Sequence, residues 1–307
     1  MLNHLLNQAE KLVKKRKKKS SERLPMTPLN NISLPANGQY GPFKFINMCV
    51  IDSILMALYC CYLKTDQVRS LFGTHQILRA VMFFLGAKRY NEAKACWFLA
   101  QIVLYKSSKI IITKVNNTDT EQFELNAWSE PTDHLNIFNE LVLVKYHFDE
   151  DRNSPPASIC QEVLCKTISS FEHLGDVRSL GINEYQPTLI LVDINRRKDT
   201  LPRLIIFDCY SRVYKLQFLL MTRKSFQNHV IVGLLLSDGW ALYDDLKADY
   251  KDFDPNSADF KEDFIILLAG YVNIPQLPFG IAEEGGYGTR VFKPSRPFDN
   301  HPKGHLD

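Results

Sequence analysis

The stretch HVIVGLLLSDGWALYDD at residues 229–245 decides the fold class because it predicts a β-hairpin. Two apolar runs stand on either side of an Asp-Gly pair, which is a strong signal for a tight turn between antiparallel strands. In such a hairpin the returning strand ends beside the start of the first strand. We therefore expect Asp244 and Asp245 to lie next to His229, at one edge of an antiparallel sheet.

Further strands are expected on both sides of this hairpin, and most of the helices come before them in the chain. The strands are predicted at residues 110–115, 141–148, 189–194, 204–210, 213–221 and 264–272, and the helices at residues 49–62, after Thr65, after Thr74, at 91–105 and at 160–174. Because the strands and helices do not alternate as βαβ units, the sequence predicts an α+β fold.

Composition divides the chain into a central domain and two tails. Residues 1–30 are expected to form a flexible basic tail, because residues 1–24 hold eight Lys and Arg but only two acids. Residues 31–275 are the predicted folded domain, and residues 276–307, which contain several Gly and Pro, are expected to be a flexible end. The whole chain has 37 basic and 34 acidic residues. Without residues 1–24 it has 29 basic and 32 acidic residues, so the rest of the chain has a net charge of −3.

Composition and charge also exclude several classes of protein. The 307 residues are 45% hydrophobic and 23% charged, an ordinary balance that excludes wholesale disorder and a fibrous repeat. No run of about 18 apolar residues occurs, so we expect no membrane partner. A mildly acidic body is a poor surface for nucleic acid, which leaves only the basic tail as a contact for it. The basic residues 14–19 fit either a solvated chain end or a nuclear-import signal.

The cysteines and the known motifs point to an intracellular protein without a cofactor. The seven cysteines are odd in number and have no regular spacing, and the start of the chain lacks the order of a signal peptide. These features predict free thiols and a nuclear or cytoplasmic location. The sequence has no GxGxxG, phosphate-loop, HExxH, GxSxG or CxxC motif. We therefore expect no cofactor and no metal centre.

Cys49 is the candidate nucleophile because it begins the first strongly apolar helix. A thiol at a helix N-terminus faces unpaired backbone N–H groups and the positive end of the helix dipole, which predicts a lowered thiol pKa. The same N–H groups, with the side chain of Asn47, are candidates to hold an oxyanion. Asp52 is expected to be an acid of the first turn that favours the dipole. The alternative is that Cys49 is a small buried hydrophobe.

His229 is the candidate base, since a thiol nucleophile needs a base and the base needs an orienting group. The hairpin supplies the orienting acid from Asp244 or Asp245. Side chains alternate along a strand, so only one of the two acids is expected to face the imidazole if the strand continues through both. The alternative is a core histidine beside two turn acids.

Three segments resemble the ubiquitin-specific peptidases, a clan of papain-like cysteine peptidases. CVIDSILMAL at residues 49–58 is similar to their cysteine box, and is closest to that of the ubiquitin-specific-peptidase-like SUMO isopeptidases. Residues 229–245, which end in WALYDD, resemble the histidine box, and FIILL at residues 264–268 resembles the strand that usually follows. The CxxC pairs of the zinc-binding fingers insertion are missing, as they are in the SUMO branch.

The resemblance implies a papain-like domain with a thumb-like helical half that carries Cys49 and a palm-like antiparallel half that carries His229 and Asp244. It implies removal of SUMO or ubiquitin-like modifiers from lysine, with Cys49 as nucleophile, His229 as base and Asp244 as the orienting acid. Asn47 would hold the oxyanion, and Asp245 could share the role of Asp244. Two other hypotheses stay open: an inactive protein that binds a modifier without cleaving it, and a viral or mobile-element type of cysteine peptidase.

Overall fold

The hairpin forms where the sequence predicts it. In the computed structural model, β10 (Phe226–Leu235) and β11 (Trp240–Asp244) pair antiparallel, with Val232 opposite Tyr243. Gly239 has a φ of 142°, a left-handed conformation that glycine adopts without strain, and it lies in the turn. The structure describes residues 1–17, 34–107, 109–115, 121–147, 176–182, 187–194, 204–207, 212–247 and 249–274.

The hairpin belongs to the larger of two sheets, whose strand order is β12-β11-β10-β9-β13-β7-β6-β5, with β8 paired to β9. All of its pairings are antiparallel. The other strands of this sheet are β5 (Val142–His147), β6 (Asp176–Leu180), β7 (Leu189–Asp193), β8 (Ile205–Phe207), β9 (Val213–Arg223), β12 (Asp249–Asp252) and β13 (Phe264–Ile274), and α7 (Ala258–Asp263) precedes β13.

Both faces of the larger sheet are buried along the apolar part of β10, which explains its unbroken apolar run. Val230, Val232 and Leu234 belong to the core that the helices share, while Ile231 belongs to a second core on the opposite face. This division follows from the alternation of side chains along a strand. A strand that is buried on both sides needs apolar residues at every position.

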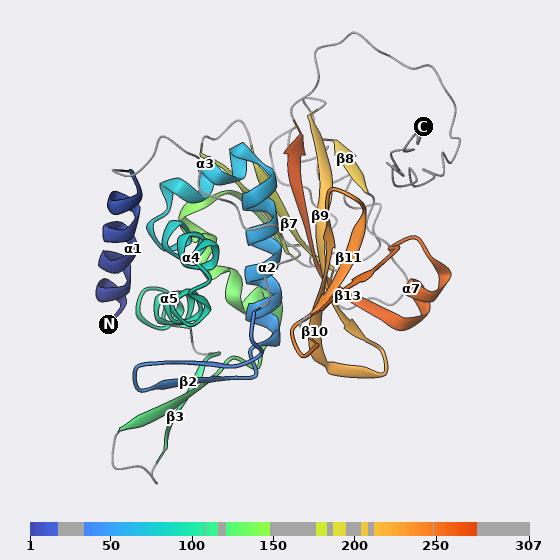
Figure 1. The fold of residues 1–307 in the computed structure, drawn as a ribbon. Coiled ribbons are helices and arrows are strands. Elements are labelled where there is room, and N and C mark those ends of the chain that lie inside the picture. The colour runs from blue at the N-terminus through green and yellow to red at the C-terminus, as the bar shows by residue number, and fades with distance from the viewer. Residues whose placement is uncertain are drawn as a thin grey trace, which may run out of the picture. The chain divides into compact units, whose positions relative to one another are not determined.

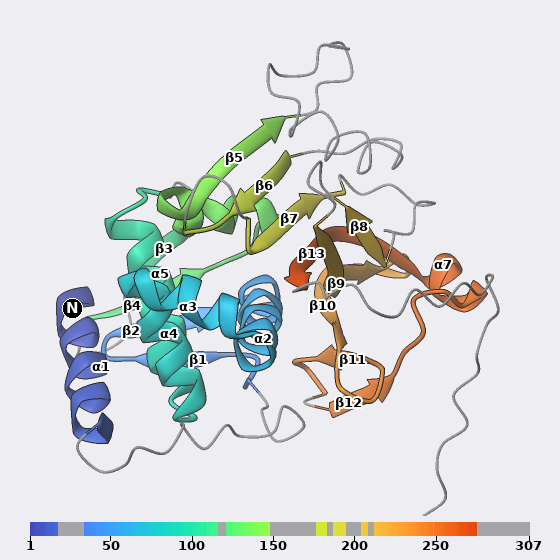
Figure 2. The same cartoon turned by 90° about the horizontal axis from the view of Figure 1, so that it is seen from above.

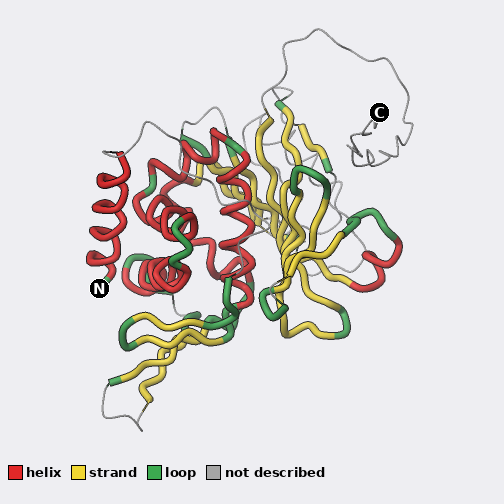
Figure 3. The backbone as a smooth tube through the Cα atoms, viewed as in Figure 1, coloured by secondary structure: helices red, strands yellow, loops and turns green. Residues whose placement is uncertain are grey.

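Four consecutive helices pack beside this sheet: α2 (Cys49–Lys64), α3 (Asp66–Thr74), α4 (Gln76–Gly86) and α5 (Tyr90–Val103). Of these, α2 lies against β9 and β10, and Figures 1 and 2 show it between the other helices and the larger sheet. Nearly all of its residues are buried, because α2 contacts other elements on all sides. The predicted α+β fold class is therefore confirmed, with helices and strands gathered in separate parts (Figure 3).

A smaller sheet, which the sequence analysis did not predict, leads the chain into α2. Its order is β1-β2-β4-β3, formed by β1 (Gly38–Tyr40), β2 (Phe43–Ile46), β4 (Gln122–Asn126) and β3 (Ile111–Val115). Strands β2 and β4 are parallel, with Ile46 opposite Asn126. The 3-10 helix η2 (Pro131–Leu141) follows β4. The segment directly before Cys49 is thus largely a strand.

The expectation of a flexible tail at residues 1–30 is wrong for its first part. Helix α1 (Leu2–Lys17) packs against α4 and α5, and its apolar residues Leu2, Leu5, Leu6 and Ala9 are buried in the shared core. These residues recur at three- and four-residue spacing, which places them on one face of the helix. The basic run masks this pattern in the composition of the segment.

Two other predictions fall outside the described residues: the helix at 160–174 and the flexible end at 276–307. Met1–Pro275 forms one compact unit, so the helices and the larger sheet belong together. Within the described part of the chain, no helix is both long and apolar enough to cross a membrane.

Candidate active site

Cys49 is the first residue of α2 and is 8% exposed. Burial raises the pKa of its thiol, and the charges of Asp245 and Asp52 add to this, while backbone hydrogen bonds from Val230 and Val50 lower it. The net direction is upward, so the expectation of a lowered pKa is wrong. Loss of hydration outweighs the helix N-terminus here, because a thiolate loses more solvation on burial than a neutral thiol does.

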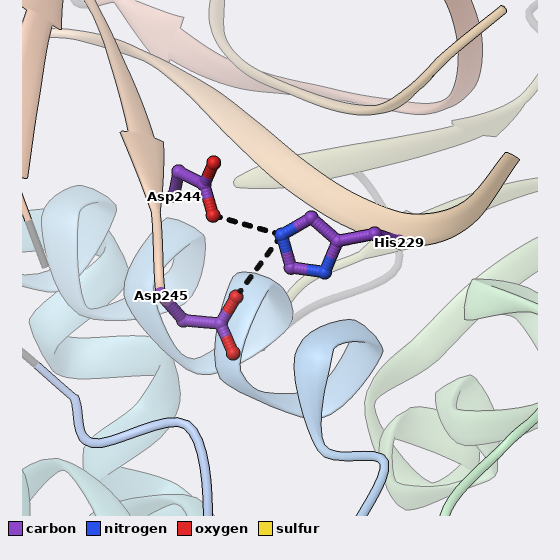
Figure 4. Close-up of side chains that lie close together, drawn as sticks. All are labelled: His229, Asp244 and Asp245. Atoms are coloured by element: carbon purple, nitrogen blue, oxygen red, sulfur yellow. Dashed lines mark hydrogen bonds and ion pairs between the residues drawn. The ribbon is translucent and has the colours of Figure 1, made fainter. Parts of the chain in front are cut away.

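His229 and two acids form a buried cluster at the open end of the hairpin. The Nε2 atom of His229 lies 2.8 Å from Oδ1 of Asp244 and 3.4 Å from Oδ1 of Asp245 (Figure 4). The first contact is a hydrogen bond, whereas Asp245 Oδ1 is buried without a hydrogen-bond partner. The predicted meeting of the histidine with an acid of the pair is present in the structure, and Asp244 makes the closer contact.

Both acids reach the imidazole because β11 ends at Asp244. Asp245 begins a turn, so the alternation of side chains does not extend to it. Asp244 also accepts hydrogen bonds from the backbone of this turn: Leu246 N donates to its Oδ1 at 3.2 Å and Lys247 N to its carbonyl at 3.1 Å. The turn thus fixes the Asp244 side chain. Burial, followed by the charge of Asp244, raises the pKa of Asp245, and His229 and Lys94 lower it.

The first turn of α2 lies directly against the strand that carries His229. Ser53 Oγ donates a hydrogen bond to the carbonyl of Val230 at 3.2 Å, and the backbone of Val230 acts on the pKa of Cys49. The register of β10 against β9 shifts between Phe226 and Val230, so His229 lies in an irregular part of the strand. Such irregularities redirect side chains next to functional sites. No pattern in the sequence indicates the Ser53 hydrogen bond or this shift in register.

Asn47, the predicted oxyanion donor, is exposed and turned toward the smaller sheet. Its Nδ2 donates to Oδ1 of Asn126 at 3.1 Å, and its φ of 55° is left-handed. Asparagine tolerates this conformation better than most residues. The left-handed backbone conformation between β2 and α2 is therefore enough to explain an asparagine at position 47, without a catalytic role.

A buried pair of ionisable side chains, which no sequence pattern indicated, joins the first turn of α2 to α5. Asp52 Oδ2 is 2.8 Å from Nζ of Lys94 on α5, and both side chains are fully buried. Asp52 is in the first turn, as expected, but it faces the interior. Burial raises its pKa to about 8, and Lys94 opposes this shift. The one sequence feature that could have indicated this pair is Lys94 itself, a single lysine within the apolar run of α5.

Among the residues that the structure describes, His229, Asp244 and Asp245 could together hold a metal ion. One donor atom from each lies within 4.8 Å of the others. A nitrogen and two carboxylate oxygens are a donor set that zinc accepts. The four described cysteines, Cys49, Cys60, Cys61 and Cys96, are buried and free.

Comparison with known proteins finds a likeness among solved structures alone. No family model and no curated protein matches the chain. Among solved structures, the chain is similar to one from the SAGA Ubp8/Sgf11/Sus1/Sgf73 DUB module bound to ubiquitin aldehyde. The two are 11% identical with a TM-score of 0.32, and the match covers 84% of this chain and 72% of the other.

Proposed function

We propose that the chain is a cysteine-type isopeptidase that removes SUMO or a ubiquitin-like modifier from lysine. The observation that carries the proposal is the hydrogen-bonded pair of His229 and Asp244, next to the α2 turn that begins with Cys49. Nucleophile, base and orienting acid come from α2, β10 and β11. We assign α2 to the helical half and these strands to the sheet half of a papain-like domain.

In this proposal His229 is a general base for a neutral thiol. Its Nε2–H donates to Asp244, so Nδ1 is the nitrogen that remains to accept the thiol proton. The raised pKa of Cys49 favours this route over a resting thiolate–imidazolium pair. The sulfur attacks the carbonyl carbon of the isopeptide bond while its proton moves to His229.

The imidazolium then returns the proton to the leaving lysine amine, and the C–N bond breaks to give a thioester. Water, deprotonated by His229, hydrolyses the thioester and restores the thiol. Asp244 holds the imidazole in one tautomer and stabilises its charged form. The backbone N–H groups at the start of α2 are assigned to the oxyanion, and Asn47 joins them if it leaves Asn126.

Two exposed aromatic side chains beside the site support a protein substrate. Trp128 is 49% exposed, and its backbone N donates to Asn126 Oδ1, the atom that also accepts from Asn47. Phe226 is 54% exposed, with its ring centroid 6.1 Å from that of His229. Exposed aromatic surface is enriched where proteins bind one another.

The test is labelling of Cys49 by electrophiles built on the C-termini of ubiquitin and SUMO. We expect one of them to form a covalent adduct with the wild type and none with Cys49→Ser, whose melting temperature stays close to that of the wild type. Turnover that survives in Cys49→Ala would end the proposal. A large loss of stability in Cys49→Ser would instead support a structural role for the thiol.

The second candidate function is a modifier-binding protein without activity. The low exposure of Cys49 and its raised pKa favour it, because both reduce the reactivity of the thiol. Saturable binding of ubiquitin or SUMO with no adduct from either electrophile would decide for this candidate. Labelling of Cys49 would decide against it.

A further inference from the structure

The side chain of Lys94 is fully buried, and its ammonium group donates hydrogen bonds to three oxygen atoms from two other segments of the chain. Its Nζ donates to Asp52 Oδ2 at 2.8 Å, to the carbonyl of Asn37 at 3.4 Å and, at closer range, to the carbonyl of Pro35. A buried ammonium group requires such partners, because burial without them is very costly. Lys94 therefore ties α5 both to the first turn of α2 and to residues 34–37.

Residues 34–37, which we call the strap, are held at their other end by β11. The hydroxyl of Tyr243 accepts a hydrogen bond from Leu34 N at 2.8 Å and donates one to Leu34 O at 3.2 Å. The Leu34 side chain is fully buried in the core shared by the helices and the sheet. The strap is thus fixed to the sheet by Tyr243 and to the helices by Lys94.

The two fixed points lie next to the candidate active site. Asp52, the partner of Lys94, is three residues after Cys49, and Tyr243 directly precedes Asp244. The charge of Lys94 also lowers the pKa of Asp245. A continuous set of buried polar contacts therefore runs from the turn that carries the thiol to the strand that carries the acids.

We propose that Lys94 and Tyr243 are positioning residues that act through the strap and hold α2 and β11 at the separation that the reaction needs. The inference rests on the proposed function for its effect on turnover, but not for its effect on the structure around Cys49. A displacement of about 1 Å at a catalytic group can lower the rate of a reaction by about 10²-fold. Neither residue is assigned contact with substrate.

Tyr243→Phe and Lys94→Met each remove one end of the attachment. Tyr243→Phe keeps the ring, and its matched control is Tyr214→Phe, which removes a buried hydroxyl that donates to Pro187 O at 3.3 Å from the opposite core. The control for Lys94→Met is Gln101→Met on the same helix, which removes a buried hydrogen bond to His134 O. Full-length proteins are compared at a temperature where all are folded.

Three measurements are made on each variant: kcat and KM for a modifier substrate, alkylation of Cys49 by iodoacetamide mapped by mass spectrometry, and hydrogen exchange of the Leu34 amide. We expect kcat to fall about tenfold in both test variants with KM within about twofold, as for a group that acts on geometry rather than on binding. Alkylation of Cys49 and exchange at Leu34 should become faster, because the strap no longer holds the buried turn. The double variant should lose less than the product of the two single losses, since both act through one element.

The controls separate the possible results. Changes in kcat and in alkylation no larger than those of Tyr214→Phe and Gln101→Met would overturn the inference, as would strictly multiplicative losses in the double variant. If the wild type turns over no modifier, the proposed function fails, and alkylation and exchange alone decide on the strap. If Lys94→Met does not fold, the comparison of Tyr243→Phe with Tyr214→Phe still tests the inference.

Discussion

The Nε2 atom of His229 lies 2.8 Å from Oδ1 of Asp244, across the open end of the β10–β11 hairpin. This contact fixes which ring nitrogen can take a proton, because a nitrogen that donates to a carboxylate cannot accept at the same time. Asp245 lies 3.4 Å from the same nitrogen and makes no hydrogen bond through its Oδ1. His229 thus has one hydrogen-bonded carboxylate, that of Asp244, and a second carboxylate nearby, that of Asp245.

The two acids should differ in their effect on turnover. Asp244→Asn is expected to lower kcat by up to about 10⁴-fold, the loss seen when the orienting acid of a triad becomes an amide. Asp245→Asn should lower kcat by a smaller factor, and His229→Ala should lower kcat at least as much as Asp244→Asn does. Steady-state rates on one modifier substrate give the comparison. Equal losses in the two Asn variants would mean that both acids share the role, and a larger loss at Asp245 would reverse the assignment.

Alkylation of Cys49 should depend on pH in the manner of a buried thiol. The pKa of Cys49 is raised above its ordinary value of 9.0, so the thiolate fraction at neutral pH is below that of free cysteine. The rate with iodoacetamide should keep rising as the pH passes 9, and His229→Ala should not abolish this rise. Pseudo-first-order rates from pH 6 to 10, with free cysteine as control, test the expectation. A plateau below pH 7 would reveal a preformed thiolate instead.

Asp52 should make the protein less stable as the pH rises. Burial raises its pKa from an ordinary 3.8 to about 8, so between these values the folded state binds more protons than the unfolded state. Stability then falls with increasing pH through this window. Asp52→Asn removes the titration, so its stability relative to the wild type should increase from pH 5 to pH 8. Urea unfolding at four pH values measures the difference, and a constant difference would contradict the assignment.

Helix α1 should contribute to stability through its apolar face. Leu5 is fully buried against the core, and Leu5→Ala is expected to lower the free energy of unfolding by about 2–5 kcal/mol. The exposed Asn7 on the same helix offers the control, since Asn7→Ala should change stability by less than about 0.5 kcal/mol. Denaturant titration of both variants gives the two values. An unchanged midpoint for Leu5→Ala would restore the description of this segment as a tail.

A chelator should leave turnover unchanged if Cys49 is the nucleophile. His229, Asp244 and Asp245 offer a donor set that a metal ion could use, and a metal-dependent hydrolase would lose activity when stripped. We expect EDTA-treated and untreated protein to react equally with the modifier electrophile. Loss of activity that added zinc restores would assign the cluster to a metal.

Local signals were sufficient for the hairpin and for α2. The Asp-Gly turn sets the register of β10 and β11, and that register places His229 beside the acids that follow Tyr243. The three- and four-residue spacing of apolar positions likewise predicts the helix that begins at Cys49. These features depend only on residues close together in the chain.

The sequence was a weaker guide to contacts between residues that are far apart in the chain. The parallel pairing of β2 with β4 joins residues about 80 apart, and the packing of α1 on α4 and α5 was hidden by the basic run beside it. The direction of the Cys49 pKa was predicted wrongly, because the helix N-terminus is visible in the sequence while the burial that outweighs it is not.

The sequence by itself determined the α+β class, the helix that starts at Cys49, and the meeting of His229 with the acid pair. Only the tertiary structure decided that β11 ends at Asp244, that Asp245 therefore turns to the same imidazole, and that Lys94 pairs with Asp52 beneath the thiol. The physical reason is that turn chemistry and periodicity act between near neighbours. Burial, and the partners that a buried charge must find, are properties of the whole packed chain.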